Sequence, residues 1–258
     1  MIKAVFLDFD GTVFSHASAR IPASTYEAVR KLRENGIKVF LCTGRAFAEF
    51  YDFDLTDFKL DGRILSNGQM VFDENDELIY ECSIQGELKD RVISLFKEKR
   101  FPMYMVTRDD IFLNDVNETV LAVQDAVSSG IPRIKEYEGE DVCMVSAFFN
   151  CEEDIQTIYE LKDLAEITWW HIGAVDIVPK GISKANGIDE VCKRYGILQS
   201  ETMGIGDGEN DMVMFKKEWT SIAMGNGYPE LLKMANYVTD ASENDGIMNA
   251  CRHFGWID

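Results

Sequence analysis

The sequence predicts an α/β fold, in which strands buried on both faces alternate with helices. A nearly continuous apolar run at Ala4–Asp8 is typical of a parallel strand inside such a sheet. The same strand–helix rhythm continues along the chain and is clear again after Gly181. Between about Ile84 and Pro179, further elements are numerous enough to form a sheet and a core of their own. A length of 258 residues allows one or two domains of this kind.

The first part of the chain predicts one helix followed by short strands. Ser24 and Glu27 match a capping box at the start of the helix. Pro22 precedes this box, and Gly36 is expected to end the helix after Asn35. The expected strands are Lys38–Thr43, Ile64–Ser66, and a hairpin of Met70–Asp73 and Glu77–Glu81 around Asn75-Asp76.

The middle and the last part of the chain each predict further helices and strands. In the middle these are the helix Glu87–Lys99, the strands Met103–Val106 and Ile111–Leu113, the helix Glu118–Val127, the strand Val142–Phe149, the helix Glu152–Leu161, and the strands Ile167–Trp170 and Ala174–Val178. In the last part they are the helix Lys184–Tyr195, the strand Met203–Ile205, the helix Asn210–Phe215, the strand Ile222–Met224, the helix Pro229–Ala235, and a final helix near Gly246–Phe254.

The composition excludes several classes of protein and of partner. Hydrophobic residues at 46% and charged residues at 28% are typical of a globular protein rather than a disordered or fibrous one. No apolar run is long enough to span a membrane, and Asp8 interrupts the apolar start too early for a signal peptide. A formal charge of −19 disfavours binding to nucleic acid or to an anionic membrane. The six cysteines lack CxxC spacing, which favours reduced thiols and a cytoplasmic protein over a disulfide framework or a zinc site.

A first acidic motif, Asp8-Phe9-Asp10-Gly11-Thr12, directly follows the first expected strand. Ligands of open α/β sheets bind at the carboxyl ends of strands. Two carboxylates there repel each other unless a cation joins them, and Gly11 would let the backbone approach a ligand closely. The alternative is an ordinary surface turn, in which Asp and Gly are common.

A second acidic motif, Gly206-Asp207-Gly208-Glu209-Asn210-Asp211, follows another apolar strand. Asp207 could therefore lie beside Asp8 and complete a site rich in oxygen atoms. Hard oxygen donors without paired His or Cys suit Mg²⁺. The alternative is a helix N-cap loop, where Asp and Asn are also favoured. Two acidic strand ends in one chain make coincidence less plausible.

Two further motifs could hold an anion. Thr43-Gly44-Arg45 follows the second expected strand, where a hydroxyl and backbone N–H groups can bind phosphate oxygens, although a simple turn is the alternative. Lys184 opens an expected helix, where a cation opposes the helix dipole unless it faces an anion. The alternative for Lys184 is a solvated surface side chain.

In this order the motifs resemble those of the haloacid dehalogenase-like hydrolases, and more closely their Cof-type branch, which includes sugar-phosphate phosphatases. The resemblance rests on these segments: IKAVFLDFDGT, CTGR, SNG, GISKANGI, GIGDGENDMVMF, AMGNG and YVTD. It implies a doubly wound parallel-sheet (Rossmann-like) core at residues 1–83 and 180–258. It also implies an inserted α/β cap domain at residues 84–179.

The resemblance also implies roles for individual residues. Asp8 would be the nucleophile that becomes an aspartyl phosphate, and Asp10 the general acid and base. The implied Mg²⁺ ligands are Asp8, the Asp10 carbonyl and Asp207, with Asp211 in support. The implied phosphate-binding residues are Thr43, Gly44, Lys184 and Asn210. Val13-Phe14 and Cys42 depart from the usual pattern, and both are interpreted as packing variants.

These expectations together describe a magnesium-dependent phosphatase of small phosphorylated metabolites, with sugar phosphates first. The alternatives are a phosphomutase, a phosphatase of vitamin or nucleotide phosphates, and a non-enzymatic receiver-like module that accepts a phosphoryl group. No nucleic-acid or membrane partner is expected, and the protein is expected to be a monomer or a small homo-oligomer. We expect loop or surface roles for His16, His171 and His253, and packing roles for Trp169 and Trp170.

Overall fold

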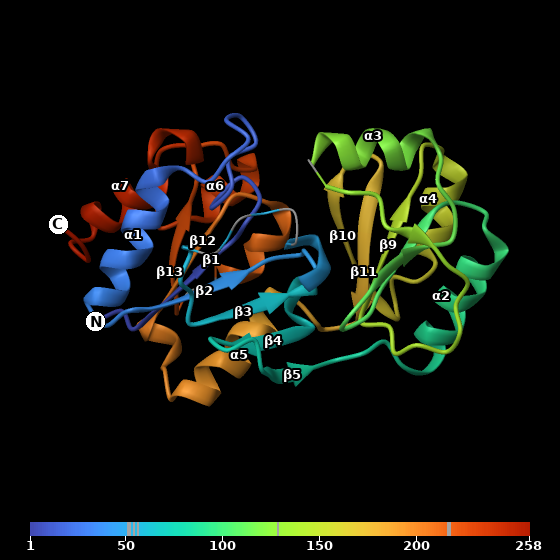
Figure 1. The fold of residues 1–258 in the computed structure, drawn as a ribbon, viewed down its shortest axis with the longest axis horizontal. Coiled ribbons are helices and arrows are strands. Elements are labelled where there is room, and N and C mark those ends of the chain that lie inside the picture. The colour runs from blue at the N-terminus through green and yellow to red at the C-terminus, as the bar shows by residue number, and fades with distance from the viewer. Residues whose placement is uncertain (51–52, 54, 56, 128, 216–217) are drawn as a thin grey trace.

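A computed structural model describes residues 1–258 except 51–52, 54, 56, 128 and 216–217. The chain forms two lobes (Figure 1). Both ends of the chain, coloured blue to teal and orange to red, build one lobe, and the green and yellow middle builds the other. Among the described residues, no helix is long and apolar enough to cross a membrane. None of the six cysteines, all of which lie in the described part of the chain, forms a disulfide bond.

The first lobe is built on an eight-stranded sheet with the order β14-β13-β12-β1-β2-β3-β4-β5. The strands β14 to β3 run parallel, whereas β4 and β5 are antiparallel additions at one edge. Its strands are β1 (Ala4–Leu7), β2 (Lys38–Cys42), β3 (Gly62–Leu65), β4 (Met70–Asp73), β5 (Leu78–Glu81), β12 (Thr202–Gly206), β13 (Thr220–Ala223) and β14 (Tyr237–Val238). The strand order reverses at β1, which pairs with β2 on one side and β12 on the other. This reversal is the switch point at which doubly wound sheets bind ligands.

Helices cover both faces of this sheet, as its sequence pattern requires. Successive residues of a strand point to opposite faces, so Val5 and Leu7 pack in one apolar cluster and Ala4 and Phe6 in another. The helices of this lobe are α1 (Ala23–Glu34), α5 (Lys184–Tyr195), α6 (Pro229–Met234) and α7 (Gly246–His253). Two apolar faces explain why the central strands contain almost no polar residues.

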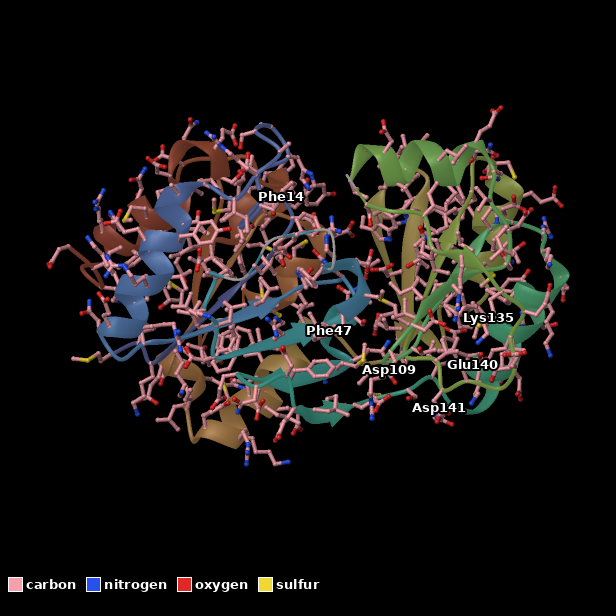
Figure 2. All side chains as sticks on the ribbon, in the orientation of Figure 1. Phe14, Phe47, Asp109, Lys135, Glu140 and Asp141 are labelled. Carbon is pink, nitrogen blue, oxygen red and sulfur yellow. The ribbon has the colours of Figure 1, made fainter. Side chains whose placement is uncertain are left out.

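The second lobe is built on a six-stranded sheet with the order β10-β11-β9-β6-β7-β8. Its elements are α2 (Gly86–Glu98), β6 (Met103–Val106), β7 (Ile111–Leu113), α3 (Glu118–Ala126), β8 (Arg133–Ile134), β9 (Met144–Phe148), α4 (Glu152–Tyr159), β10 (Ala165–His171) and β11 (Ala174–Pro179). Figure 2 shows Phe14 and Phe47 on the first lobe, and Lys135 and Glu140 on the second. Lys135 lies 4.9 Å from the ring centroid of Phe112 and pairs with Glu140.

Most predicted elements are present with ends that differ by a few residues, but the capping box is wrong. Helix α1 begins after Pro22, and none of the described side chains caps its first turn. Ser24 lies inside the helix, where its hydroxyl donates to Asp245 at 2.5 Å instead. The Gly36 prediction is confirmed, because Asn35 caps the helix and Gly36 has a φ of 77°.

The predicted helix Asn210–Phe215 is instead a 3-10 helix, η4 (Glu209–Met214). Its first turn is tightened because the Asp211 carboxylate accepts hydrogen bonds from the backbone N–H groups of Asp207 and Gly208, each at 2.9 Å. The two-residue strands β8 and β14 were not predicted, since so short a pattern has no recognisable period.

Candidate active site

The first acidic motif forms a tight loop at the end of β1. The Asp8 N–H continues the sheet by donating to Ile205 at 2.9 Å, and the Phe14 N–H then donates back to Phe9 at 2.7 Å. Gly11 has a φ of +76°, and an added Cβ there would lie 2.1 Å from Oδ2 of Asp207. The glycine therefore lets the β1 loop touch the neighbouring acidic loop, which no larger residue would allow.

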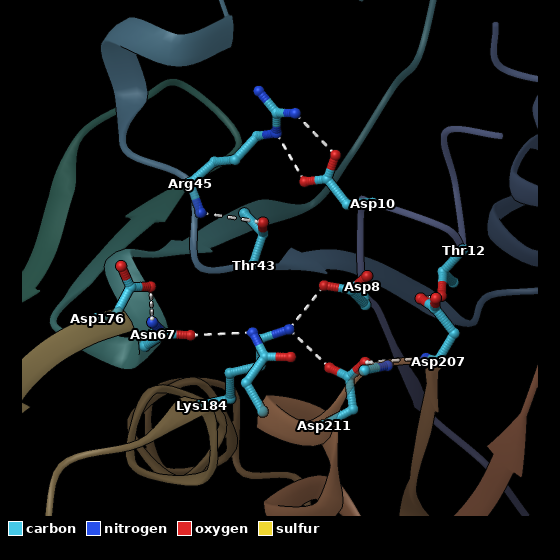
Figure 3. A network of polar contacts seen from close by, with 12 residues as sticks. Asp8, Asp10, Thr12, Thr43, Arg45, Asn67, Asp176, Lys184, Asp207 and Asp211 are labelled. Carbon is cyan, nitrogen blue, oxygen red and sulfur yellow. Dashed lines mark hydrogen bonds and ion pairs between the residues drawn. The ribbon is translucent and has the colours of Figure 1, made fainter. Parts of the chain in front are cut away.

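The second acidic motif lies against the first one, at the end of β12. Asp207 accepts a hydrogen bond from the Thr12 hydroxyl at 2.9 Å, which ties the two loops together (Figure 3). Asp211 is fully buried beneath the loop, and an added Cβ at Gly206 would lie 2.4 Å from its carboxyl carbon. Gly11 and Gly206 therefore both make room for a carboxylate.

Lys184 joins the two motifs from a third element. Its Nζ lies 2.6 Å from Oδ1 of Asp8 and 2.6 Å from Oδ1 of Asp211, at the start of α5 (Figure 3). The side chain is wholly buried, so the solvated alternative is wrong. Burial would lower the pKa of Lys184, but the charges of Asp211 and Asp8 outweigh it and raise the pKa above its usual value. Lys184 therefore stays a cation. Its two carboxylate partners offset its unfavourable position at the positive end of the helix dipole.

Three carboxylates are close enough to share a cation. Asp8, Asp207 and Asp211 each offer an oxygen atom within 4.8 Å of the others. Burial, and then repulsion from Asp211, raises the pKa of Asp207 to about 7. Burial and the same repulsion raise the pKa of Asp8 well above its usual value. Buried oxygen ligands that repel one another fit a hard divalent cation such as Mg²⁺.

The side chain of Asp10 is outside that group. It accepts hydrogen bonds from Nε and Nη2 of Arg45 at 2.6 and 2.7 Å, and Nε2 of His16 lies 3.2 Å away. Burial would raise the pKa of Asp10, but the contacts with His16 and Arg45 outweigh it and lower the pKa to about 2. The structure thus gathers the three carboxylates that were predicted near the metal, Asp8, Asp207 and Asp211. The side chain of Asp10, of which only the backbone carbonyl was predicted as a ligand, turns toward Arg45.

Arg45 is a functional candidate that the sequence analysis did not single out. It is 6% exposed, and its Nη2 also donates to the backbone oxygen of Val127 in the second lobe at 3.1 Å. Its guanidinium lies 4.9 Å from the ring centroid of Phe53. The signal was present, because Arg45 follows Thr43-Gly44 directly after the end of β2, the strand next to β1.

The predicted phosphate-binding residues lie around one cavity of about 590 Å³ between the lobes. Thr43, Gly44 and Asn210 line it together with Asp8, Asp10 and Asp207, whereas Lys184 and Asp211 lie beneath this lining. The Thr43 hydroxyl accepts the Arg45 N–H at 3.1 Å, and Asn210 donates to Oδ1 of Asn67 at 3.2 Å. The first lobe thus supplies an acidic floor with hydrogen-bonding groups beside it.

The second lobe supplies the opposite wall. Alternate residues of β6, β9 and β11 face this cavity, and the residues between them pack in the core of the second lobe. Those that face the cavity are Tyr104, Val106, Met144, Ser146 and Asp176. Asp176, which the sequence analysis missed, is buried, and burial chiefly raises its pKa to about 7.

The aromatic and histidine expectations were incomplete. Trp169 and Trp170 pack on Phe149 and Phe148, with ring centroids 5.3 and 5.9 Å apart, as predicted. Both also line the cavity. His16 and His171 line it too, whereas His253 stacks on Tyr237 with ring centroids 4.0 Å apart.

Comparisons with known proteins agree with this arrangement. A solved structure described as a sugar phosphatase of haloacid dehalogenase subclass IIB, BT4131, is 33% identical. It aligns with 99% of this chain and 100% of its own, with a TM-score of 0.89. The Bacillus subtilis protein YkrA, whose name provisionally calls it a phosphatase, is 30% identical over 99% of this chain and 98% of its own length. A more distant Bacillus subtilis relative, the 5-amino-6-(5-phospho-D-ribitylamino)uracil phosphatase YitU, is 24% identical over 97% of this chain and 96% of its own length.

The sequence model of one enzyme family covers nearly the whole chain. It matches residues 5–251, a range that contains both acidic loops, Lys184 and the inserted lobe. This breadth excludes the receiver-like alternative, which has no such inserted lobe. A chain with this core, this cap domain and this acidic site belongs to the haloacid dehalogenase-like hydrolases and is a phosphatase of the Cof type.

Proposed function

We propose that this enzyme is a Mg²⁺-dependent phosphatase that hydrolyses phosphomonoesters of small metabolites through an aspartyl-phosphate intermediate. The observation that carries the proposal is the buried Lys184 ammonium between Asp8 and Asp211, beneath the lining of the cavity between the lobes. This arrangement lets an anionic carboxylate stand where it can meet an anionic phosphate.

Asp8 is the proposed nucleophile. Lys184 holds its Oδ1 at 2.6 Å, which leaves Oδ2 for attack on phosphorus. Attack forms a bond from Oδ2 to phosphorus and breaks the bond to the leaving oxygen, so that one difficult displacement becomes two easier ones. Asp8, Asp207, Asp211 and the Asp10 carbonyl would hold Mg²⁺, which supplies positive charge against the phosphate oxygens. Thr43, the Gly44 backbone and Asn210 would bind the remaining phosphate oxygens.

Asp10 is the proposed general acid and base. It would give a proton to the leaving alkoxide and later take one from the attacking water. While Arg45 holds both of its oxygens, its lowered pKa keeps it ionised. We infer that Asp10 becomes an acid only after this ion pair opens, which requires a movement of Arg45 or of Asp10.

Residues 84–179 are proposed to act as the cap that covers the site and recognises the leaving group. Among the described residues, the Tyr104 hydroxyl, Oε1 of Gln124 and Nη1 of Arg45 are buried without a hydrogen-bond partner. All three side chains line the cavity. Buried polar groups need partners, and the hydroxyl groups of a substrate would supply them. These groups, together with the likeness to a sugar phosphatase, support sugar phosphates as the first substrate class.

A second candidate substrate class keeps the same reaction. Trp169, Trp170 and His171 line the cavity, and aromatic rings there suit a leaving group that carries a flat heterocycle. The relative YitU is named for the phosphate of a ribitylaminouracil, which contains such a ring, so vitamin and nucleotide phosphates stay the alternative. A phosphomutase would use the same residues and return the phosphoryl group to the substrate.

A phosphate-release screen with Mg²⁺ tests the proposal. The panel contains hexose phosphates, ribityl and flavin phosphates, pyridoxal phosphate and nucleotides. We expect release of free phosphate, fastest from sugar phosphates. Formation of an isomer without free phosphate would show a mutase, and no turnover of any ester would refute the proposed reaction.

A further inference from the structure

One hydrogen-bonded chain of side chains runs from the cap domain to the phosphate-binding side of the core. Asp176 lies on β11 of the cap, where its Oδ1 accepts from the Ser146 hydroxyl at 2.7 Å. Its Oδ2 accepts from the Asn67 amide at 2.8 Å, across the boundary between the lobes (Figure 3). Oδ1 of Asn67 in turn accepts from the amide of Asn210 at 3.2 Å. Asp176 and Asn67 are both nearly inaccessible to solvent.

The order of donors in this chain is fixed at its cap end. Above its pKa of about 7, Asp176 is a carboxylate that can only accept hydrogen bonds, so Asn67 must turn its NH₂ group toward Asp176. Its oxygen then faces Asn210, which must turn its own NH₂ group toward Asn67. One N–H of Asn210 is used in this contact, and the second remains for an oxygen of the substrate phosphate. With the amide reversed, the oxygen of Asn210 would take its place and repel the phosphate.

The backbone holds Asn67 in place for this purpose. Its N–H donates to the Thr43 carbonyl at 3.0 Å, beside the phosphate-binding loop. Ser66 and Asn67 both have left-handed φ values, 50° and 55°, which cost free energy in residues with a side chain. Gly44 packs directly against the contact, since an added Cβ there would lie 3.2 Å from Oδ1 of Asn67 and 3.4 Å from Oδ2 of Asp176. The backbone therefore fixes where the Asn67 side chain lies, but not whether its amide oxygen or its NH₂ group points toward Asp176. These two orientations are nearly equivalent for an isolated side chain.

We propose that Asp176 is a positioning residue, through which the seated cap sets the Asn67 and Asn210 amides so that the phosphate is met by an N–H group. The phosphate-binding site of the core is then complete only when the cap supplies this carboxylate. This inference rests on the proposed phosphatase function and adds to it a link between cap seating and grip on the phosphate.

The test measures how tightly the enzyme binds the phosphate group, separately from how it recognises the leaving group. For Asp176→Ala we expect kcat/KM to fall by about 10- to 100-fold, the range for loss of a hydrogen bond to a charged group. The factor should be the same for esters with different leaving groups. Inhibition by inorganic phosphate should weaken about tenfold, since that anion has no leaving group. Asn67→Ala, which breaks the chain from the core side, should reproduce both effects and carries the test if Asp176→Ala does not fold.

Conservative and control variants separate positioning from packing. Asp176→Asn should retain most activity, because its amide oxygen can still accept from Asn67 while its NH₂ group donates to Ser146. Asn114→Ala removes another buried side chain of the cap, one that bonds only within that lobe among the described residues. It should lower the melting temperature without changing phosphate inhibition. The Asp176→Ala/Asn210→Ala double variant should be no worse than Asn210→Ala alone.

If the wild-type enzyme is active, three results would overturn the inference. They are unchanged phosphate inhibition in Asp176→Ala, a loss confined to particular esters, and equal damage from Asp176→Asn and Asp176→Ala. A wild-type enzyme that releases no phosphate would instead refute the proposed function. In that case, thermal shifts with inorganic phosphate still compare the same variants.

Discussion

The acidic edge of the core sheet and the cap face above it supply opposite groups to one cavity. The core offers carboxylates at the ends of β1 and β12, with Lys184 buried beneath them. The cap face offers rings and neutral polar groups, with the buried Asp176 as its acid. This difference supports our proposal that the core carries the reaction while the cap face, apart from Asp176, recognises the leaving group, and the predictions below test that division.

The largest effect should come from the core. Asp8→Asn keeps the size of the side chain but removes the attacking charge and one metal ligand, so kcat should fall by several orders of magnitude. The melting temperature should not fall, since the substitution also relieves repulsion from Asp211. Steady-state phosphate release and a thermal melt measure both, and near-normal turnover would refute the nucleophile.

Removal of Mg²⁺ should abolish turnover for every ester alike. The carboxylates of Asp8, Asp207 and Asp211 then repel one another, and only the Lys184 ammonium between Asp8 and Asp211 offsets their charge. Mg²⁺ added back should restore the rate, and it should raise the melting temperature of the wild type more than that of Asp207→Asn. Full activity in excess chelator would contradict the metal site.

Lys184→Met should lower kcat/KM by about 100-fold or more, since a buried charge aimed at the reacting groups is lost. Lys180→Met is the matched control, because Lys180 is exposed and pairs with Glu166 at 3.2 Å. The control should cost almost nothing. A greater loss in Lys180→Met would mean that the wrong lysine was chosen.

Trp170→Ala, on the cap face, should change kcat/KM by only a few-fold to about tenfold, and unequally among esters. Its ring lines the cavity and has no reason to contact the phosphate. Ile134→Ala, an exposed cap residue, is the control. A uniform loss across all esters would show that Trp170 acts on the phosphate rather than on the leaving group.

The last prediction concerns stability and pH rather than turnover. Burial chiefly raises the pKa of Asp176 from 3.8 to about 7, so the folded state binds its proton more tightly than the unfolded state does. This group therefore stabilises most below about pH 4, and its contribution falls as the pH rises to about 7, by on the order of 4 kcal/mol. Urea unfolding of the wild type should show this decline, and Asp176→Asn should show less of it. Equal slopes would contradict the shift.

The core was predictable because its chemistry lies in short segments at strand ends. A buried strand followed by DFDGT or GDGEND places carboxylates at one sheet edge whatever the rest of the chain does. The direction of a side chain was not predictable in the same way. Asp10 turns toward Arg45 because a bidentate ion pair is available across the neighbouring strand, and no local pattern shows that pairing.

The helices and strands of the cap were predictable, but the roles of the side chains that face the cavity were not. Its helices and strands follow from periodicity, yet the role of Asp176 depends on Asn67, which is 109 positions away in the chain. The capping box at Ser24 fails for a related reason, because Asp245 offers that hydroxyl a partner from another part of the chain. Local propensity gives way wherever a distant group competes for the same side chain.

The two chain segments that connect the lobes are not equivalent. The outgoing one leaves from the edge strand β5, where the Cys82 N–H donates to Gln69 at 2.8 Å. The returning one runs from the end of β11 at Pro179 through residues 180–183 into α5 at Lys184, and its Ser183 carbonyl leaves no room for a Cβ on Gly68, which would lie 2.1 Å away. An exchange of caps during evolution could therefore vary the exit freely. The returning segment would have to keep its length and the rotation of α5 about its axis. Otherwise the buried ammonium of Lys184 would miss both carboxylates.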